Sequence, residues 1–343
     1  MELSERKLKI LAAIVNAYIQ TGEPVGSKLL ALDLGVSSAT VRNEMADLVE
    51  MGFLEQPHTS AGRVPSQEGY RVFVDRLMGK SPLTAAEKRY FDSILLARAY
   101  DPQTLMNDVS RLLADWTRMA AVATTPSGGG ADVRAVQFVQ TSRRTAMIIL
   151  ISSAGTMKNR VFRCDFDITP QMMQVFFRVV NERVARKPVS SITPAFIQSL
   201  AASLGEIAML MSSALMALLE VAQDSMEAKV FLNGQMNLLR YPEFENGGAR
   251  RVMDFLERPH DFSRLMVQCG NSQCSRIILG RESKQPELTE SGLVFSNYLV
   301  NGSTAGMIGV IGPMRMDYSK LVAGVDYLAA AAGKLLTELM TEE

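Results

Sequence analysis

The chain opens with apolar residues that recur at the period of an α-helix. Five of them share one face: Leu8, Leu11, Val15, Tyr18 and Ile19. Ser4 stands where an N-cap is expected, and Gly22 stands where a helix commonly ends in the left-handed conformation. The pattern predicts a first helix between these two residues.

Two further helices are predicted close behind the first. One begins at Ser27 and ends at Gly35, and a three-residue turn leads to another that opens at Ser37 or Ser38. Two helices joined by so tight a turn predict a helix-turn-helix.

The third predicted helix has an apolar face and a small, polar face. The apolar face holds Val41, Met45, Leu48 and Val49, and the opposite face holds Ala39, Arg42, Asn43 and Ala46. Arg and Asn can bind guanine and adenine edges in a major groove, and a helix N-terminus favours a phosphate. A solvated surface is the alternative, and it is favoured by the charge of residues 1–80, which hold nine basic and ten acidic residues.

The segment after the third helix favours DNA binding. "GFLEQ" is suited to a strand, "PHTSAGR" is a turn-rich loop, and "VPS" can return as a second strand before Ser66 caps a fourth helix. A helix-turn-helix followed by a small hairpin is a winged helix. Thr59, Ser60 and Arg63 can then bind phosphates or enter a minor groove, and Gly62 lets the loop turn tightly.

Two long segments resemble one known family. "VSSATVRNEMADLVEMGFLEQPHTSAGRVPSQEGYRVFVD", residues 36–75, resembles the winged-helix signature of the HrcA family of heat-inducible transcription repressors. "IGVIGPMRMDYSKLVAGVDYL", residues 308–328, is similar to that family's other signature. The expected DNA-binding residues are Ser27, Lys28, Ser38, Ala39, Thr40, Arg42, Asn43, Thr59, Ser60 and Arg63.

The middle of the chain predicts an α+β module. A helical region at residues 85–119 breaks near Asp101 and Pro102, and "MAAVATTP" follows as a strand. Glycines 128–130 form a joint suited to a domain boundary. Beyond it, "VRAVQFVQT", "TAMIILIS" and "MKNRVFRCDF" predict three strands, and helices are expected from about Thr169 to Met226.

One of these helices is apolar on nearly every face. It spans "EIAMLMSSALMALLEVAQ", residues 206–223, and must be buried in its own domain or against a partner. Both interpretations stay open on the sequence. The candidate dimer interface consists of Met209, Met211, Leu215 and Met216.

The last third of the chain returns to mixed strands and helices. Strands are expected in "KVFLNGQMNLL", "SRIILG" and "AGMIGVIG", a helix in "ARRVMDFLER", and a final helix from Asp317 to about Met340. The predicted fold class is α+β and multi-domain. The resemblance implies a winged helix at residues 1–80 and a GAF-like α/β domain at 81–128 and 228–343, interrupted by an inserted dimerisation domain at 131–227.

Composition sets limits on the chemistry of the chain. Its 343 residues are 47% hydrophobic, and 36 basic residues balance 36 acidic ones, so no global basic field marks a nucleic-acid partner. The first residues do not resemble a signal peptide, no apolar run reaches the length of a membrane span, and three cysteines suit a reducing compartment. We therefore expect a cytoplasmic protein with no membrane partner.

No catalytic, metal or cofactor site is expected. Cys269 and Cys274 lie near His260, but no fourth ligand stands at a recognisable spacing. A GAF-type thiol redox enzyme that uses the two cysteines remains as an alternative. Gly306, Gly309 and Gly312 have neither the dinucleotide-binding nor the phosphate-loop spacing, and are better explained by a strand that enters a turn.

The resemblance implies a specific function. It predicts a repressor that binds an inverted repeat, the CIRCE element, ahead of chaperone operons and loses activity on heat shock. It also implies a GroEL-type chaperonin as partner. A homodimer is expected on physical grounds too, because one nearly neutral winged helix offers few phosphate contacts while two copies combine their affinities. The alternative is a winged-helix regulator controlled by a small effector in the GAF-like domain.

Overall fold

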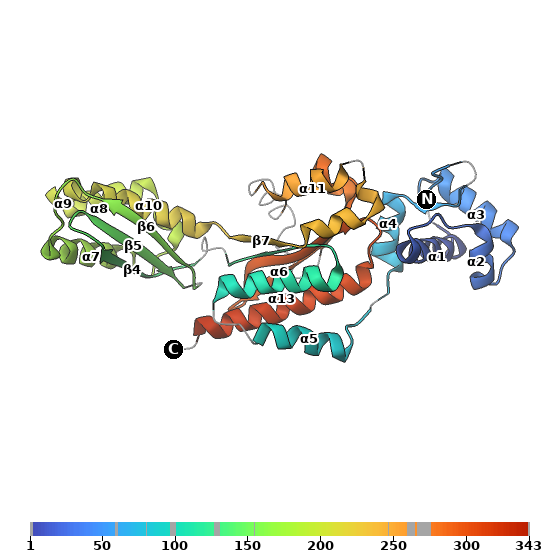
Figure 1. Ribbon diagram of the computed structural model, residues 1–343, viewed down its shortest axis with the longest axis horizontal. Coiled ribbons are helices and arrows are strands. Elements are labelled where there is room, and N and C mark those ends of the chain that lie inside the picture. Colours follow the sequence, from blue (N-terminus) through green and yellow to red (C-terminus); the bar gives the residue numbers. More distant parts are fainter. Residues whose placement is uncertain are drawn as a thin grey trace.

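The protein is an elongated row of three bodies (Figure 1). The computed structural model describes residues 3–58, 61–79, 81–96, 101–126, 131–153, 155–245, 247–258, 265 and 276–341. The N-terminal body lies at one end, a sheet with helices on both faces lies in the middle, and a second, smaller sheet with its own helices lies at the other end (Figure 1).

The N-terminal body is a winged helix, as predicted. Its elements are α1 (Glu5–Thr21), α2 (Ser27–Leu34), α3 (Ser38–Glu50), β1 (Leu54–Glu55), β2 (Val64–Pro65), α4 (Gln67–Val72) and the π-helical turn η1 (Phe73–Leu77). The hydroxyls of Ser4, Ser37 and Ser66 accept hydrogen bonds from backbone amides three residues on, which confirms them as N-caps. Gly22 and Gly35 are left-handed, so both helix ends are also confirmed.

The middle body is built on a five-stranded antiparallel sheet in the order β7-β3-β10-β9-β8. Its strands are β3 (Ala120–Thr124), β7 (Val230–Asn233), β8 (Arg276–Leu279), β9 (Ser291–Val300) and β10 (Ser303–Pro313). Helices α5 (Ala85–Leu96), α6 (Pro102–Thr117) and α13 (Tyr318–Thr341) lie together on one face, and α11 (Gly248–Leu256) covers the other (Figure 1).

Side chains alternate between the two faces of this sheet, as the period of a strand requires. Val294, Ile308 and Val310 join the core beneath α6 and α13. Leu293, Phe295 and Ile311 join the core beneath α11. Both faces of the sheet are therefore shielded from solvent, and the central strands consist of nearly continuous apolar runs.

The third body is connected to the middle body through two neighbouring strands of the middle sheet. The chain leaves that sheet after β3 and returns to it at β7, which pairs with β3. Between them lies a sheet in the order β4-β5-β6, and four helices follow along the chain. The elements are β4 (Val133–Gln140), β5 (Thr145–Ser152), β6 (Met157–Arg163), α7 (Pro170–Val184), α8 (Pro194–Leu204), α9 (Glu206–Leu210) and α10 (Ser212–Met226).

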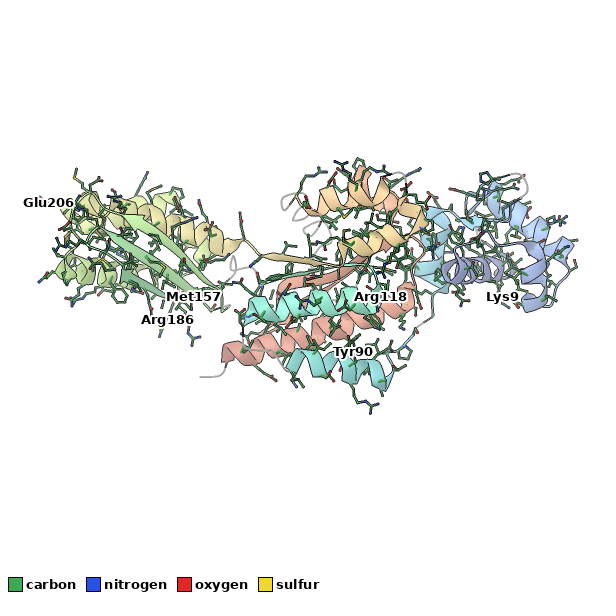
Figure 2. The ribbon with its side chains drawn as sticks, in the orientation of Figure 1. Lys9, Tyr90, Arg118, Met157, Arg186 and Glu206 are labelled. Carbon is green, nitrogen blue, oxygen red and sulfur yellow. The ribbon has the colours of Figure 1, made fainter. Side chains whose placement is uncertain are left out.

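The helices of the third body cover one face of its sheet. Ala146, Ile148 and Leu150 of β5 are fully buried against α7 and α10. The alternate residues point to the opposite face, where Met157 and Val161 of β6 are each 58% exposed (Met157 is labelled in Figure 2). Within the described part of the chain, no helix is packed on that face.

Several predicted elements differ from the structure. The helix expected over residues 206–223 is interrupted at Met211, which separates α9 from α10. The second half of "KVFLNGQMNLL" is a 3-10 helix, Gln235–Arg240, rather than a strand. Strand β9 was not predicted, and the joint at residues 128–130 lies outside the described residues.

The three glycines of "GMIGVIG" lie in strand β10, which ends at Pro313 and enters a bend before α13, in agreement with the predicted strand that enters a turn. A Cβ on Gly309 would lie 1.9 Å from Cδ1 of Phe295, and one on Gly306 would lie 2.4 Å from Oη of Tyr298. Gly306 and Gly309 therefore let large aromatic side chains of β9 cross the neighbouring strand, whereas a Cβ on Gly312 would lie 2.6 Å from Sδ of Met119.

The length and hydropathy of the helices indicate whether any of them could span a membrane. Among the described residues, none of the helices combines the length and apolar character that a membrane span requires.

Candidate nucleic-acid interface

The exposed face of α3 is small and hydrogen-bonding. Val41, Met45 and Leu48 are buried in the core of the winged helix. The face they leave outward carries Ala39, Arg42, Asn43 and Ala46, all exposed. These are the side chains that a recognition helix needs at a major groove, because small residues allow close approach while Arg and Asn bind base edges.

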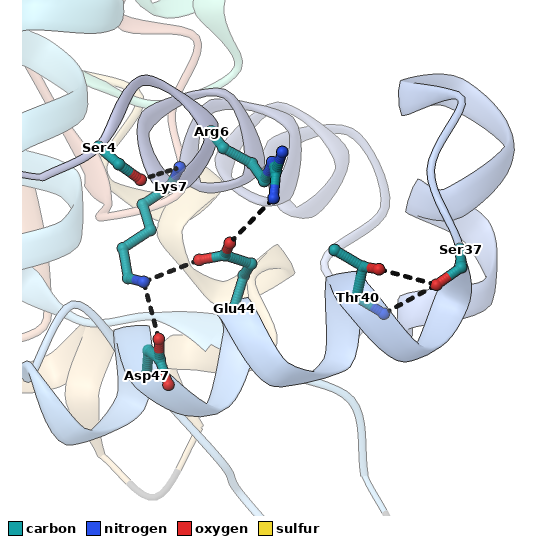
Figure 3. A network of polar contacts seen from close by, with 7 residues as sticks. All are labelled: Ser4, Arg6, Lys7, Ser37, Thr40, Glu44 and Asp47. Carbon is teal, nitrogen blue, oxygen red and sulfur yellow. Dashed lines mark hydrogen bonds and ion pairs between the residues drawn. The ribbon is translucent and has the colours of Figure 1, made fainter.

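A lysine of α1 forms ion pairs with two of the three acidic residues of α3. Lys7 Nζ lies 2.8 Å from Oε2 of Glu44 and 2.7 Å from Oδ2 of Asp47 (Figure 3). Arg6 adds a longer contact of 3.8 Å to Glu44. The hydrogen bonds to Asp47 and Glu44 raise the pKa of Lys7 above its ordinary value, so its positive charge is retained at neutral pH.

This network changes the charge that α3 presents at the surface. The sequence predicts only that Glu44 and Asp47 lie farther along the recognition helix. The structure pairs both carboxylates with a cation and ties α3 to α1, which fixes the helix and reduces its negative field. Lys7 is 37 and 40 residues from its partners, so local sequence patterns could not reveal the pairing.

The first turn of α3 is organised by hydroxyl groups. Ser37 Oγ accepts from the Thr40 amide at 3.0 Å and lies 2.8 Å from Thr40 Oγ1. Ser38 Oγ lies 3.1 Å from Oγ of Ser27, at the start of α2. Of the predicted contact residues, Ser27 and Ser38 are therefore engaged with each other and Thr40 is engaged with Ser37. All three are half-buried, whereas Lys28 is exposed.

The wing has a third backbone segment that the sequence did not reveal. Arg63 and Val25 form an antiparallel bridge, with both N–H···O distances at 2.9 Å. A Cβ on Gly62 would lie 2.5 Å from the Val25 carbonyl oxygen, and Gly62 is not among the glycines with positive φ. Glycine is thus required for the close approach of two chain segments rather than for a left-handed turn.

The predicted wing contacts are only partly described. Arg63 is half-buried, and its Nη1 donates to the carbonyl oxygens of Ala61 and Gly62 at 3.4 and 3.5 Å. Its guanidinium lies over the backbone of its own loop. Thr59 and Ser60 lie outside the described residues.

The four candidate interface residues of the third body separate into two pairs. Met211 and Leu215 are buried in the core of the same chain, at 0% and 4% exposure, so they cannot also contact a partner. The break at Met211 turns that side chain inward. Met209 and Met216 are exposed, at 84% and 53%.

A cavity of about 550 Å³ lies between the winged helix and the middle body. The described residues that line it include Val74, Met78 and Arg71 from the winged helix, and Ile278 and Arg276 from β8. No group of three or more metal-ligating side chains occurs among the described residues. Cys269, Cys274 and His260 lie outside them.

Two family models match the chain. The model described as "Winged helix-turn-helix transcription repressor, HrcA DNA-binding" matches residues 2–76, and the model described as "HrcA protein C terminal domain" matches residues 103–322.

Relatives named as heat-inducible transcription repressors match nearly the whole chain. It is 35% identical to the heat-inducible transcription repressor HrcA of Acetivibrio thermocellus over 341 residues, which covers 96% of this chain and 95% of that protein. It is also 35% identical to the protein of the same name from Carboxydothermus hydrogenoformans, covering 98% of each. A crystal structure of a hypothetical protein shares the fold, with a TM-score of 0.65, 20% identity, and coverage of 98% of this chain and all of that one.

The Lys7 network leads to a first prediction. Lys7→Met leaves two carboxylates of α3 unpaired near the DNA, so affinity for DNA should fall severalfold, as measured by fluorescence anisotropy. The loss should shrink at high salt, because added ions screen the repulsion between exposed charges. The matched control is the triple variant Lys7→Met, Glu44→Gln, Asp47→Asn, which should regain affinity. If the triple variant stays as weak as the single one, Lys7 acts by contacting a phosphate itself.

Proposed function

The chain belongs to the HrcA family of heat-inducible transcription repressors, and from this premise we propose that it binds an inverted-repeat operator of the CIRCE type as a homodimer. Bound there, it represses the chaperone operons that follow, until heat shock removes its activity. The observation that carries the proposal is the exposed face of α3, where Arg42 and Asn43 stand beside small residues and two nearby carboxylates are paired with Lys7.

Charge explains why two copies are needed. The winged-helix residues 1–80 carry no net positive charge, so a single domain releases few counterions from DNA and gains little affinity that way. Two linked winged helices add their contacts on a two-fold symmetric site, which also matches the symmetry of an inverted repeat.

The uncovered sheet face of the third body supports a self-association surface. Val139, Met147 and Val161 form one row across the three strands, and Ile151 and Met157 form part of another. Val139 is 43% exposed, and the apolar side chains of these rows gain from burial. We propose that a second copy of the chain covers this face, because a two-fold contact needs one patch that is complementary to itself.

The proposed chaperonin partner fits the surface of the chain. Several large apolar side chains are mostly exposed, namely Leu32, Leu96, Met209 and Met236. A chain of three bodies with such a surface is prone to aggregate when it unfolds. We propose that a GroEL-type chaperonin maintains the active repressor and that unfolded proteins compete for the chaperonin on heating.

The DNA-binding residues give the second prediction. Arg42→Ala or Asn43→Ala should reduce the preference for operator over random DNA by about 1–3 kcal/mol, because each removes contacts to base edges. Arg63→Ala should instead weaken both complexes equally and reduce the salt slope by about one phosphate contact. Quantitative footprinting at several salt concentrations measures both effects. Unchanged footprints for all three variants would contradict the assignment of α3 as recognition helix.

The self-association surface gives the third prediction. Val161→Asp places a charge within the proposed contact, so the dimer dissociation constant should rise about a hundredfold, equivalent to roughly 3 kcal/mol. Analytical ultracentrifugation should detect monomer where the parent chain is dimeric, with circular dichroism unchanged, since the side chain is already exposed in one copy.

Met216→Asp is the matched control for this experiment. It also places a charge on an exposed apolar residue of the third body, but on α10 rather than on the sheet. A monomer produced by Met216→Asp alone would place the interface on α10. If neither variant dissociates, the third body does not mediate the dimer.

Heat sensitivity gives the fourth prediction. After a heat pulse, operator binding should recover in the presence of chaperonin and ATP and stay low in their absence. An excess of an unfolded competitor protein should abolish the recovery. Full and spontaneous recovery without chaperonin would exclude that part of the proposed function while leaving DNA binding intact.

A further inference from the structure

The segment between β10 and α13 lies against the winged helix. Tyr318 is fully buried, and its ring meets that of Tyr70 in α4 edge-on, with centroids 6.3 Å apart and an interplanar angle of 68°. The Tyr318 hydroxyl donates to the carbonyl oxygen of Met314, which holds the ring in place. This aromatic pair joins residues from opposite ends of the sequence.

Arg315 makes a second connection in the same segment. Its Nε forms an ion pair with Glu243, and its guanidinium lies over the ring of Tyr241, 5.8 Å from the centroid. Gly22, which ends α1, is so close that a Cβ there would lie 3.1 Å from Arg315 Cζ. A planar side chain that is anchored in the middle body therefore fills the space beside the end of α1.

The last helical turns of the winged helix make further connections to the middle body. Gln67 Oε1 accepts from the Arg281 amide at 3.0 Å. Arg71 Nη1 donates to the Ile277 carbonyl oxygen and to Glu282, each at 3.3 Å. Ser319 Oγ donates to the carbonyl oxygen of Gly79.

The two bodies also share one apolar core. Buried residues of α1, α3 and α4 belong to the same contiguous cluster as Met316, Tyr318 and Leu321. The winged helix is therefore not a freely tethered module. It is docked through α1, α4 and the chain after η1, and a rotation about any one of these contacts would break the others.

We infer that the segment from Met314 to Ser319 fixes the angle at which α3 is presented, so that Arg315 and Tyr318 are positioning residues that select the half-site spacing of the operator. The inference rests on the proposed function, because spacing matters only to a dimer on an inverted repeat. It assigns a role in DNA recognition to residues that touch no DNA.

The physical basis is the effective concentration of the second winged helix. Once one copy is bound, the other reaches its half-site only if the docking holds it at the matching distance and angle. A rigidly docked pair is preorganised for one spacing and pays little entropy on binding. An undocked pair, held only by the short chain between η1 and α5, would sample many spacings and match each of them weakly.

The test measures affinity for a series of operators whose half-sites are separated by one-base-pair steps over a helical turn of about 10 base pairs. The parent chain should prefer one spacing. Arg315→Ala should bind that repeat about tenfold or more weakly and respond less to spacing. Its affinity for a single half-site should stay within about twofold, because the α3 surface is unchanged.

Matched variants separate a loss of docking from a loss of folding. Arg315→Lys keeps a cation beside Glu243 and should restore part of the spacing preference. Arg250→Ala removes an arginine of the same body whose side chain is 85% exposed, and should match the parent chain. If Arg315→Ala misfolds and loses half-site binding, Gln67→Ala tests the inference in its place. This variant removes the hydrogen bond to the Arg281 amide and should still flatten the spacing profile.

Each result decides the inference. An unchanged spacing profile in folded Arg315→Ala and Gln67→Ala would overturn it while leaving the proposed repressor function in place. A parent chain that binds the inverted repeat no better than a single half-site would overturn the dimeric function and the positioning role together.

Discussion

A DNA-binding domain without net positive charge must obtain its affinity from the placement of a few groups. In residues 1–80 the acidic side chains outnumber the basic ones by one, so a general electrostatic field cannot hold this domain on DNA. The other features follow from that constraint. Lys7 pairs with two carboxylates of α3, hydroxyl groups order the first turn of that helix, and the middle body holds the whole domain in a fixed orientation.

Local chemistry made most of the winged helix predictable from sequence. Helix ends depend on residues within one turn, so Ser4 and Gly35 were enough to set two of them, and the start of α3 was narrowed to Ser37 or Ser38. The bridge between Val25 and Arg63 and the Lys7 network join distant segments and leave no periodic signal. The docking role of the second family signature was hidden for the same reason, since its partners lie in the first eighty residues.

Periodicity was less informative where both faces of an element are buried. Strand β9 lies between β8 and β10 with helices on both sides, so its apolar run lacks the alternation that marks a half-exposed strand. In the third body, apolar residues on every side of 206–223 concealed a helix break. The inward turn at Met211 decides which side chains remain exposed, and sequence alone could not divide Met211 and Leu215 from Met209 and Met216.

The pairing of β3 with β7 has a consequence for how the chain folds. Thr124 pairs with Val230, the Thr125 amide donates to the Lys229 carbonyl oxygen, and the Lys229 amide donates to Oγ1 of Thr125, which closes the end of the ladder. Topologically, the third body replaces a β-turn with roughly a hundred residues, and closing so long an open loop costs entropy. If that body folds first, it brings its own ends together and shortens the effective loop. The β3–β7 pair of the middle sheet would then close over a much shorter effective loop, at a smaller cost in entropy.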